Sequence, residues 1–178
     1  MQHFAEGVAD WGSDRIEVAP QMLPVAEIVV ECLAHTNADT HELLSAFIDT
    51  AASRKWEQSY TKADAVSSKM LAGYGYAEVI GKLGPFVSDR TRAGIGVWGS
   101  AITYPPHRHA AEELYLVLGG GAEFVLGEEG SDEIAWRGPG EMVHVTPHLR
   151  HGFRTQDQPL ALFYVWRDGD LREKSTFS

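Results

Sequence analysis

The sequence is poor in cysteine, in basic residues and in long apolar runs. Its single cysteine, Cys32, cannot form an intrachain disulfide, which fits a reducing compartment. Lys and Arg number 15 against 25 Asp and Glu, so the net charge of −10 argues against a nucleic acid as the main partner. No stretch approaches the roughly 18 apolar residues of a membrane span, and the N-terminus lacks the pattern of a signal peptide. We therefore expect a cytoplasmic protein without a membrane partner.

The composition is that of an ordinary globular protein. Of the 178 residues, 44% are hydrophobic and 22% are charged. A chain of this length buries about 70% of its unfolded surface on folding, so it needs neither a disulfide nor a structural metal. A metal bound by this chain would therefore serve chemistry rather than folding.

The N-terminal part of the chain has apolar residues at helical spacing, and we predict a helical region over residues 1–80. A second helix should follow Asp39, because Asp39 with Glu42 three residues later resembles a capping box. A third is expected near residues 63–71, whereas residues 1–20 show no regular pattern. The stripe of the first helix consists of Val25, Ile28, Val29, Cys32 and Leu33, and that of the second of Leu43, Leu44, Phe47, Ile48 and Ala51.

From residue 94 onwards, short apolar or alternating runs are separated by Gly and Pro clusters, as in an antiparallel sheet. We expect a mainly β fold, with a single jelly-roll barrel over residues 81–178 and the helices packed on its outside as one compact unit. The helices would cover the apolar face that carries Leu114, Leu116 and Leu118. The predicted strands are residues 94–103, 112–118, 122–126, 133–136, 141–145, 151–155 and 160–167.

The most informative stretch runs from Thr103 to Gly120. Successive side chains of a strand point to opposite faces, so the odd-numbered positions share one face. On that face lie His107, His109, Glu113 and Tyr115, whose imidazoles and carboxylate are ligands for a divalent transition metal. The neighbouring Glu112 is turned to the other face by the same alternation.

A second motif lies about forty residues further along the chain. Gly140 and Glu141 open a strand that leads through Pro147 to His151. His144 and His148 are rivals of His151 as a ligand. We predict that His107, His109, Glu113 and His151 surround one divalent transition metal, either Zn, Fe, Mn or Ni, with one or two positions open for a small molecule.

The two motifs together resemble those of the cupin superfamily. A narrower resemblance, to the cupin-type dimethylsulfoniopropionate lyases, extends from about Trp56 to Arg167. It is carried by Trp-Glu-Gln-Ser-Tyr at 56–60, Gly-Tyr-Ala-Glu-Val-Ile-Gly at 75–81, Tyr-Pro-Pro-His at 104–107, Ala-Glu-Glu-Leu-Tyr at 111–115 and Ala-Leu-Phe-Tyr-Val-Trp-Arg at 161–167. The resemblance implies cleavage of dimethylsulfoniopropionate, a sulfonium carboxylate, to dimethyl sulfide and acrylate by β-elimination.

The resemblance also implies roles for individual residues. Tyr115 matches the catalytic base, Tyr104 a second active-site tyrosine that contacts the substrate, and Trp166 an aromatic side chain that lines the cavity. His107 matches a residue that either binds the metal or lies beside it on the substrate side. Trp166 could equally pack in the core, and Trp56 and Tyr60 could either join helix to sheet or offer aromatic faces to the sulfonium.

Two other functions fit the same residues. One is a related cupin lyase, isomerase or dioxygenase that acts on another small carboxylate, and the other is a non-catalytic cupin sensor. Because a fold alone does not determine the reaction, the tyrosines beside the metal motif are the feature that favours proton abstraction. A homodimer is a further possibility, since cupin barrels often pair.

Overall fold

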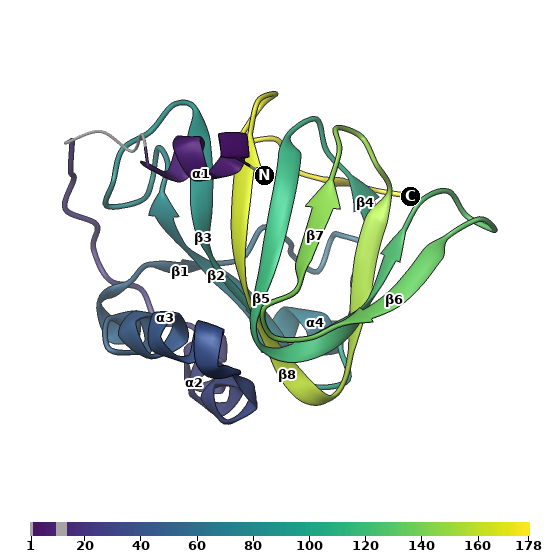
Figure 1. Cartoon of the computed structure of the whole chain (residues 1–178), viewed down its shortest axis with the longest axis horizontal. Helices are drawn as coiled ribbons and strands as arrows, with labels where there is room; N and C mark the ends of the chain where they lie inside the picture. The colour runs from purple at the N-terminus through teal and green to yellow at the C-terminus, as the bar shows by residue number, and fades with distance from the viewer. Residues whose placement is uncertain (1, 10–13) are drawn as a thin grey trace.

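The computed structural model describes residues 2–9 and 14–178, and it is dominated by one curled sheet of nine strands (Figure 1). The strands pair antiparallel, and β5 and β8 are by far the longest. The expected mainly β fold with external helices is confirmed. The strands are β1 (Trp56–Glu57), β2 (Tyr74–Ile80), β3 (Thr91–Trp98), β4 (Thr103–Arg108), β5 (Glu112–Leu126), β6 (Glu133–Arg137), β7 (Met142–Val145), β8 (His151–Arg167) and β9 (Thr176–Phe177).

The sheet follows the order β1-β2-β3-β8-β4-β9, and β5 pairs with β6, β7 and β8. The sequence predicted separate strands over 112–118 and 122–126, but β5 runs through both. The pairing of β5 with β8 shifts register on both sides of Gly120, whose φ is 72°. Glycine at this bulge lets the strand bend without ending. The predicted strands 151–155 and 160–167 are likewise one strand, β8.

The first predicted strand, residues 94–103, covers parts of two strands, β3 and β4. β3 ends at Trp98, and Ala101, with a φ of 52°, lies in the turn before β4. β4 continues beyond residue 103, where no strand was predicted because two prolines lie within it. Proline cannot donate to a strand ladder, and the pairing of β4 with β8 is irregular at that point. β1 and β2 were also not predicted. β1 pairs with β2, and the pairing of β2 with β3 links both sides of the boundary predicted at residue 80.

The helices are α1 (Gln2–Ala9), α2 (Val25–Cys32), α3 (Ala38–Ile48) and α4 (Ser68–Gly73), with short 3₁₀ turns at Leu33–His35 and Ala51–Ser53. The presence of α1 corrects the expectation of irregular structure over residues 1–20. The third predicted helix, 63–71, is shorter and later than expected. It begins after Ser67, whose hydroxyl caps it by accepting the N–H of Met70 at 3.1 Å.

The cap of α3 is Asn37 rather than the predicted Asp39. The Asn37 side-chain oxygen accepts the backbone N–H groups of Asp39 and Thr40, each at 3.0 Å. The Thr40 hydroxyl accepts the Asn37 N–H at 3.2 Å, so the residue three positions later is threonine rather than glutamate. The Asn37 amide also donates to the carbonyl of Pro139 at 2.7 Å, which ties the helix to the turn between β6 and β7.

Helices α1, α2 and α3 cover the outer face of the sheet, as the sequence predicted, whereas α4 packs with the aromatic residues of the inner face. Cys32 of α2 and Leu44 of α3 pack with Leu118 of β5, and all three are fully buried. Leu114 packs in a separate cluster with Phe4 of α1. Burial raises the pKa of the Cys32 thiol to about 12, which fits its expected role as a packing residue. The inner face of the sheet carries the aromatic cluster described below.

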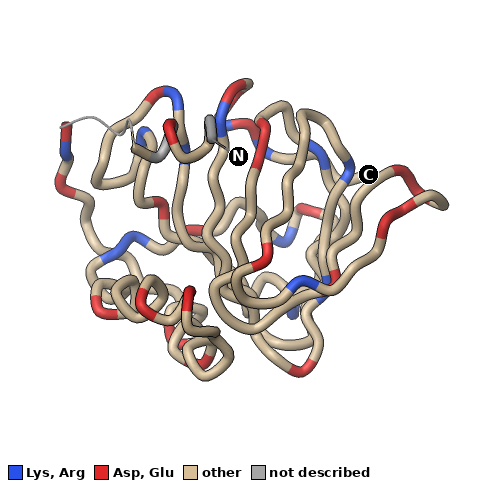
Figure 2. The backbone as a smooth tube through the Cα atoms, viewed as in Figure 1, with Lys and Arg blue, Asp and Glu red and all other residues tan. Residues whose placement is uncertain are grey.

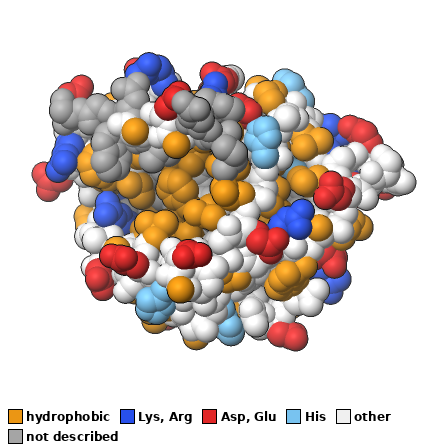
Figure 3. All heavy atoms as spheres, in the orientation of Figure 1, with side chains coloured by type: hydrophobic (Ala, Val, Ile, Leu, Met, Phe, Trp, Pro, Cys, Tyr) orange, Lys and Arg blue, Asp and Glu red, His pale blue; other side chains and the backbone are white. Residues whose placement is uncertain are grey.

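Lysines and arginines are dispersed along the chain (Figure 2). Apolar side chains also reach the surface between the helices and the sheet on the face shown in Figure 3. Within residues 2–9 and 14–178, no helix combines the length and apolar character needed to cross a bilayer.

The helix–sheet contact gives a stability test. We expect Gly119→Ala to lower the free energy of unfolding by about 1–3 kcal/mol, because a Cβ at this position would overlap the Cys32 carbonyl oxygen. Gly138→Ala is the matched control, since its Cβ would meet no atom closer than 3.6 Å. Urea denaturation measures both, and equal stabilities of the two variants would contradict the described docking of α2 on β5.

Candidate metal centre and pocket

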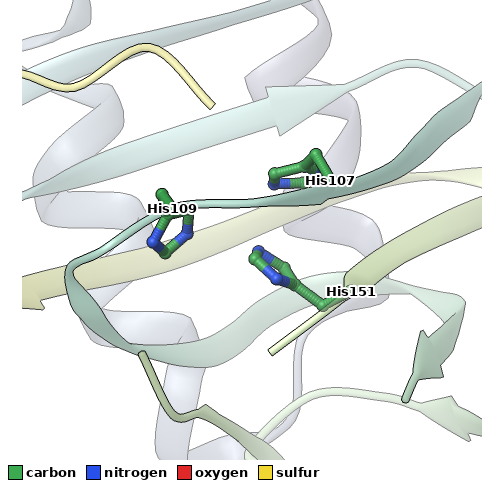
Figure 4. A group of neighbouring side chains, drawn as sticks. All are labelled: His107, His109 and His151. Atoms are coloured by element: carbon green, nitrogen blue, oxygen red, sulfur yellow. The ribbon is translucent and has the colours of Figure 1, made fainter. Parts of the chain in front are cut away.

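Three buried histidines converge where β4, the turn after it and the start of β8 meet. His107 lies in β4, His109 follows that strand, and His151 begins β8, with exposed fractions of 1%, 2% and 1%. Their ligand nitrogens lie within 4.8 Å of one another, and their imidazoles face one another (Figure 4). The register pairs His107 directly with His151. Two distant parts of the chain thus form one cluster.

Each imidazole is oriented by a backbone carbonyl group. The hydrogen bond places a proton on Nδ1, so Nε2 is the nitrogen that remains for a ligand. The buried Nε2 of His151 has no hydrogen-bond partner among the described residues, as a metal ligand would when its ion is absent. The donor set therefore fits a divalent transition metal. The Nδ1 atoms of His107, His109 and His151 lie 2.9, 2.9 and 2.8 Å from the carbonyl oxygens of Pro105, Ala111 and Leu149.

The carboxylate of Glu113 lies beside this cluster. Its Oε2 atom is 2.9 Å from Nε2 of His109 and 3.4 Å from Nε2 of His151. Its Oε1 atom accepts the indole N–H of Trp166, the residue directly opposite in the β5–β8 register. Glu112 points away, and its carboxylate contacts His144 at 2.7 Å. The structure thus brings together all four predicted ligands and leaves Glu112 outside.

The protonation of the cluster follows from these contacts. Burial opposes charge on Glu113, but the hydrogen bond to His109 and the nearby imidazole of His151 outweigh it and hold the pKa of the carboxyl well below its usual range. Burial alone would lower the pKa of His109, yet the contact with Glu113 raises it. Burial and the neighbouring His151 lower the pKa of His107. A divalent cation would therefore displace the proton of His109 on binding.

The structure also places the rival residues. His144 is exposed and paired with Glu112, and His148 is an exposed loop residue with a φ of 61°. Neither reaches the cluster. Trp56 is fully buried in the helix–sheet core, where its indole donates to the carbonyl of Ala51 at 3.0 Å. Trp56 therefore packs helix against sheet and does not offer its ring to the pocket.

A pocket open to solvent lies beside Glu113. Its wall contains all six tyrosines of the chain and two of its tryptophans, so it is strongly aromatic. The charged side chains at the wall are Arg92, Glu113, Glu173 and Lys174. The aromatic residues are Tyr60, Tyr74, Tyr76, Trp98, Tyr104, Tyr115, Tyr164 and Trp166.

The predicted site tyrosines lie between the pocket and the histidines. The ring of Tyr115 is 6.3 Å from that of His151, and the ring of Tyr104 stacks on His107 at 4.2 Å. The Tyr104 and Tyr60 hydroxyls are 2.9 Å apart and hydrogen bonded. Burial, together with the charge of Glu113, raises the pKa of Tyr115 well above its usual value. Trp166 stacks on His109 with 4.2 Å between ring centroids.

Several pocket residues were missed by the sequence analysis. Tyr74 and Tyr76 lie in β2, a strand that was not predicted. Tyr164 is two residues before Trp166, so strand alternation alone would have placed both on the same face. Arg92 carried no sequence signal, because only the pairing of β3 with β8 brings it to the pocket.

Comparison with known proteins gives a consistent result. A sequence profile described as dimethylsulfoniopropionate (DMSP) lyase matches residues 7–162. The chain is 31% identical over 154 residues to the DMSP lyase DddQ of Ruegeria pomeroyi, which covers 86% of this chain and 74% of that protein.

Solved structures of DMSP lyases also resemble this chain. The crystal structure of DddQ from Ruegeria pomeroyi superposes with a TM-score of 0.83 and 27% identity, covering 99% of this chain and 91% of that one. A structure reported with the DMSP lyases RdDddP and RnDddQII gives a TM-score of 0.81 and 26% identity, over 99% and 96% of the chains. An oxalate decarboxylase of Bacillus subtilis, 18% identical, shares the fold over 60% of this chain and 28% of that one, with a TM-score of 0.53.

The two adjacent glutamates provide a matched test of the metal centre. We expect Glu113→Gln to weaken metal binding by roughly 10- to 100-fold, because it removes the negative charge beside the histidines. Glu112→Gln should leave binding unchanged, since its carboxylate lies on the other face. Metal content after dialysis against defined free-metal concentrations measures both. Equal metal content in the two variants would show that Glu113 is not part of the metal centre.

Proposed function

The chain belongs to the dimethylsulfoniopropionate lyase family, and we propose that it cleaves dimethylsulfoniopropionate to dimethyl sulfide and acrylate in the pocket beside the three histidines. The observation that carries the proposal is the position of Tyr115, which lines the pocket with its ring 6.3 Å from that of His151. A candidate proton acceptor and Glu113 of the candidate metal centre thus line the same cavity. The family relationship supplies the substrate, and the geometry supports the chemistry.

The reaction is a β-elimination. A base removes a proton from the carbon next to the carboxylate, and that electron pair forms the new double bond. The bond between the β-carbon and sulfur breaks, and its electrons leave with sulfur as neutral dimethyl sulfide. Acrylate remains and the base holds the proton, so atoms and charge balance.

We assign Tyr115 as this base. A free tyrosine has a pKa of about 10, and lowering it by two units requires about 2.7 kcal/mol. Burial of Tyr115 adds to that demand, so the phenolate needs a positive charge nearby. A divalent ion held by His107, His109, Glu113 and His151 would supply that charge and would also draw electron density from the substrate carboxylate.

The aromatic wall suits the other end of the substrate. A sulfonium is a cation without N–H donors, so the faces of aromatic rings attract it without a specific hydrogen bond. Tyr104 and Trp166, the predicted substrate contacts, belong to this wall, and Tyr60 joins them through its hydrogen bond to Tyr104.

The decisive experiment is to supply dimethylsulfoniopropionate to the purified, metal-loaded protein. We expect headspace gas chromatography to detect dimethyl sulfide, and the release to stop when a chelator removes the metal. Tyr115→Phe should retain metal and lose about 100-fold or more of the activity, because it removes only the hydroxyl that accepts the proton.

Glu112→Gln, which alters a carboxylate outside the site, serves as the control and should retain activity. Absence of dimethyl sulfide from the metal-loaded wild-type protein would refute the proposed substrate. Full activity in Tyr115→Phe would instead refute the assignment of the base alone.

A further inference from the structure

An ionic cluster at the edge of the pocket, in which Glu78 and Arg92 are largely buried and Arg172 is exposed, carries one more positive than negative charge. The carboxylate of Glu78 in β2 has an exposed side-chain fraction of 2%, and its Oε2 atom contacts two arginines. Nε of Arg92 lies 2.9 Å away and Nη1 of Arg172 lies 3.0 Å away. The other oxygen accepts the backbone N–H of Leu83 at 2.9 Å. One carboxylate therefore balances only one of two guanidinium charges.

Arg92 is the member of this cluster that lines the pocket. Its guanidinium lies 5.3 Å from the ring centroid of Tyr76 and 5.3 Å from that of Trp166. Its Nη1 atom donates to the carbonyl of Leu171 at 3.3 Å. The side chain is thus held in place before any ligand arrives, which reduces the entropic cost of binding an anion.

The hydroxyl of Tyr164 is a buried donor without a hydrogen-bond partner among the described residues. Tyr164 lines the same pocket. In the pairing of β8 with β3 it lies opposite Gly94, and two residues further along β8, Trp166 lies opposite Arg92. A Cβ on Gly94 would lie 2.9 Å from the Tyr164 oxygen, so the glycine leaves room for this hydroxyl. Burial raises the pKa of Tyr164, so the hydroxyl keeps its proton and can donate.

The other charged side chains of the pocket are already engaged. Glu113 contacts the histidines, Glu173 accepts the backbone N–H of Ala110 at 2.7 Å, and Lys174 pairs with Asp64 at 2.6 Å. An unpartnered buried donor is costly, and in native proteins it indicates a partner that binds there. Beside an excess positive charge, that partner should be an anion.

We propose that Tyr164 and Arg92 form an anion subsite that binds the carboxylate of the substrate. The identity of this ligand rests on the proposed function, whereas the subsite itself rests on the geometry. A carboxylate has two oxygens, so contact of one with a metal ion leaves the other for Tyr164 and Arg92. Tyr164 would then fix the carbon chain next to Tyr115, its direct neighbour across β5 and β8.

The test uses propionate, a carboxylate without sulfonium, and its neutral analogue propionamide. We expect NMR titration of the full-length protein to show that the wild type binds propionate more tightly than propionamide. Tyr164→Phe should weaken propionate binding by roughly 10- to 100-fold, the usual effect of losing a hydrogen bond to a charged group, and should leave propionamide binding within about threefold. Arg92→Lys should reduce the preference for propionate in the same direction.

Stability provides a second, independent readout. Tyr164→Phe should keep or raise the midpoint of urea denaturation, because the hydroxyl it removes is unpartnered. Tyr74→Phe is the matched contrast and should lower the midpoint, because the Tyr74 hydroxyl accepts the N–H of Tyr60 at 2.8 Å.

Either of two outcomes would overturn the subsite. One is propionate affinity in Tyr164→Phe equal to that of the wild type, and the other is no binding of propionate by the wild type. Neither depends on lyase activity. Tyr164-dependent propionate binding without release of dimethyl sulfide would therefore refute the proposed function and leave the anion subsite standing.

Discussion

The antiparallel pairing of β5 with β8 is the interaction on which the rest of the site depends. Its register places Glu113 beside Trp166 and Tyr115 beside Tyr164, so the carboxylate, the phenols and the indole share one inner face. The same β8 begins at His151, which the pairing with β4 brings to His107. A slip of one residue in either pairing would turn these side chains to the outer face, where α2 and α3 pack.

Local patterns in the sequence were sufficient for the residues that alternate along one segment. Strand alternation separated Glu113 from Glu112, and the structure places them on opposite faces for that reason. Helical spacing identified the apolar faces of α2 and α3, although local hydrogen bonding placed the cap at Asn37 rather than at Asp39. The mainly β fold followed from the turn residues after position 94.

The features that could not be predicted from the sequence depend on pairing between distant strands or on strands that continue through glycine or proline. β5 continues through three glycines that read as a turn, and β4 continues through two prolines. Arg92 and Tyr164 meet at the pocket only because β3 pairs with β8, a contact between residues more than seventy positions apart. Glu78, which holds two arginines, lies in a strand with no clear alternation. A single sequence does not indicate which distant residues come into contact, because these contacts are stabilised only once the whole sheet has formed.

The gathering of all six tyrosines around one cavity has a practical consequence for spectroscopy. Every phenol chromophore of the chain borders the same space, so ultraviolet difference spectra in the phenol and phenolate bands report on this cavity without contributions from phenols elsewhere. Ionisation of one phenol on metal loading, or a change in ring environment on ligand entry, would be visible without any label. The phenolate absorption of this protein therefore reports on a single cavity.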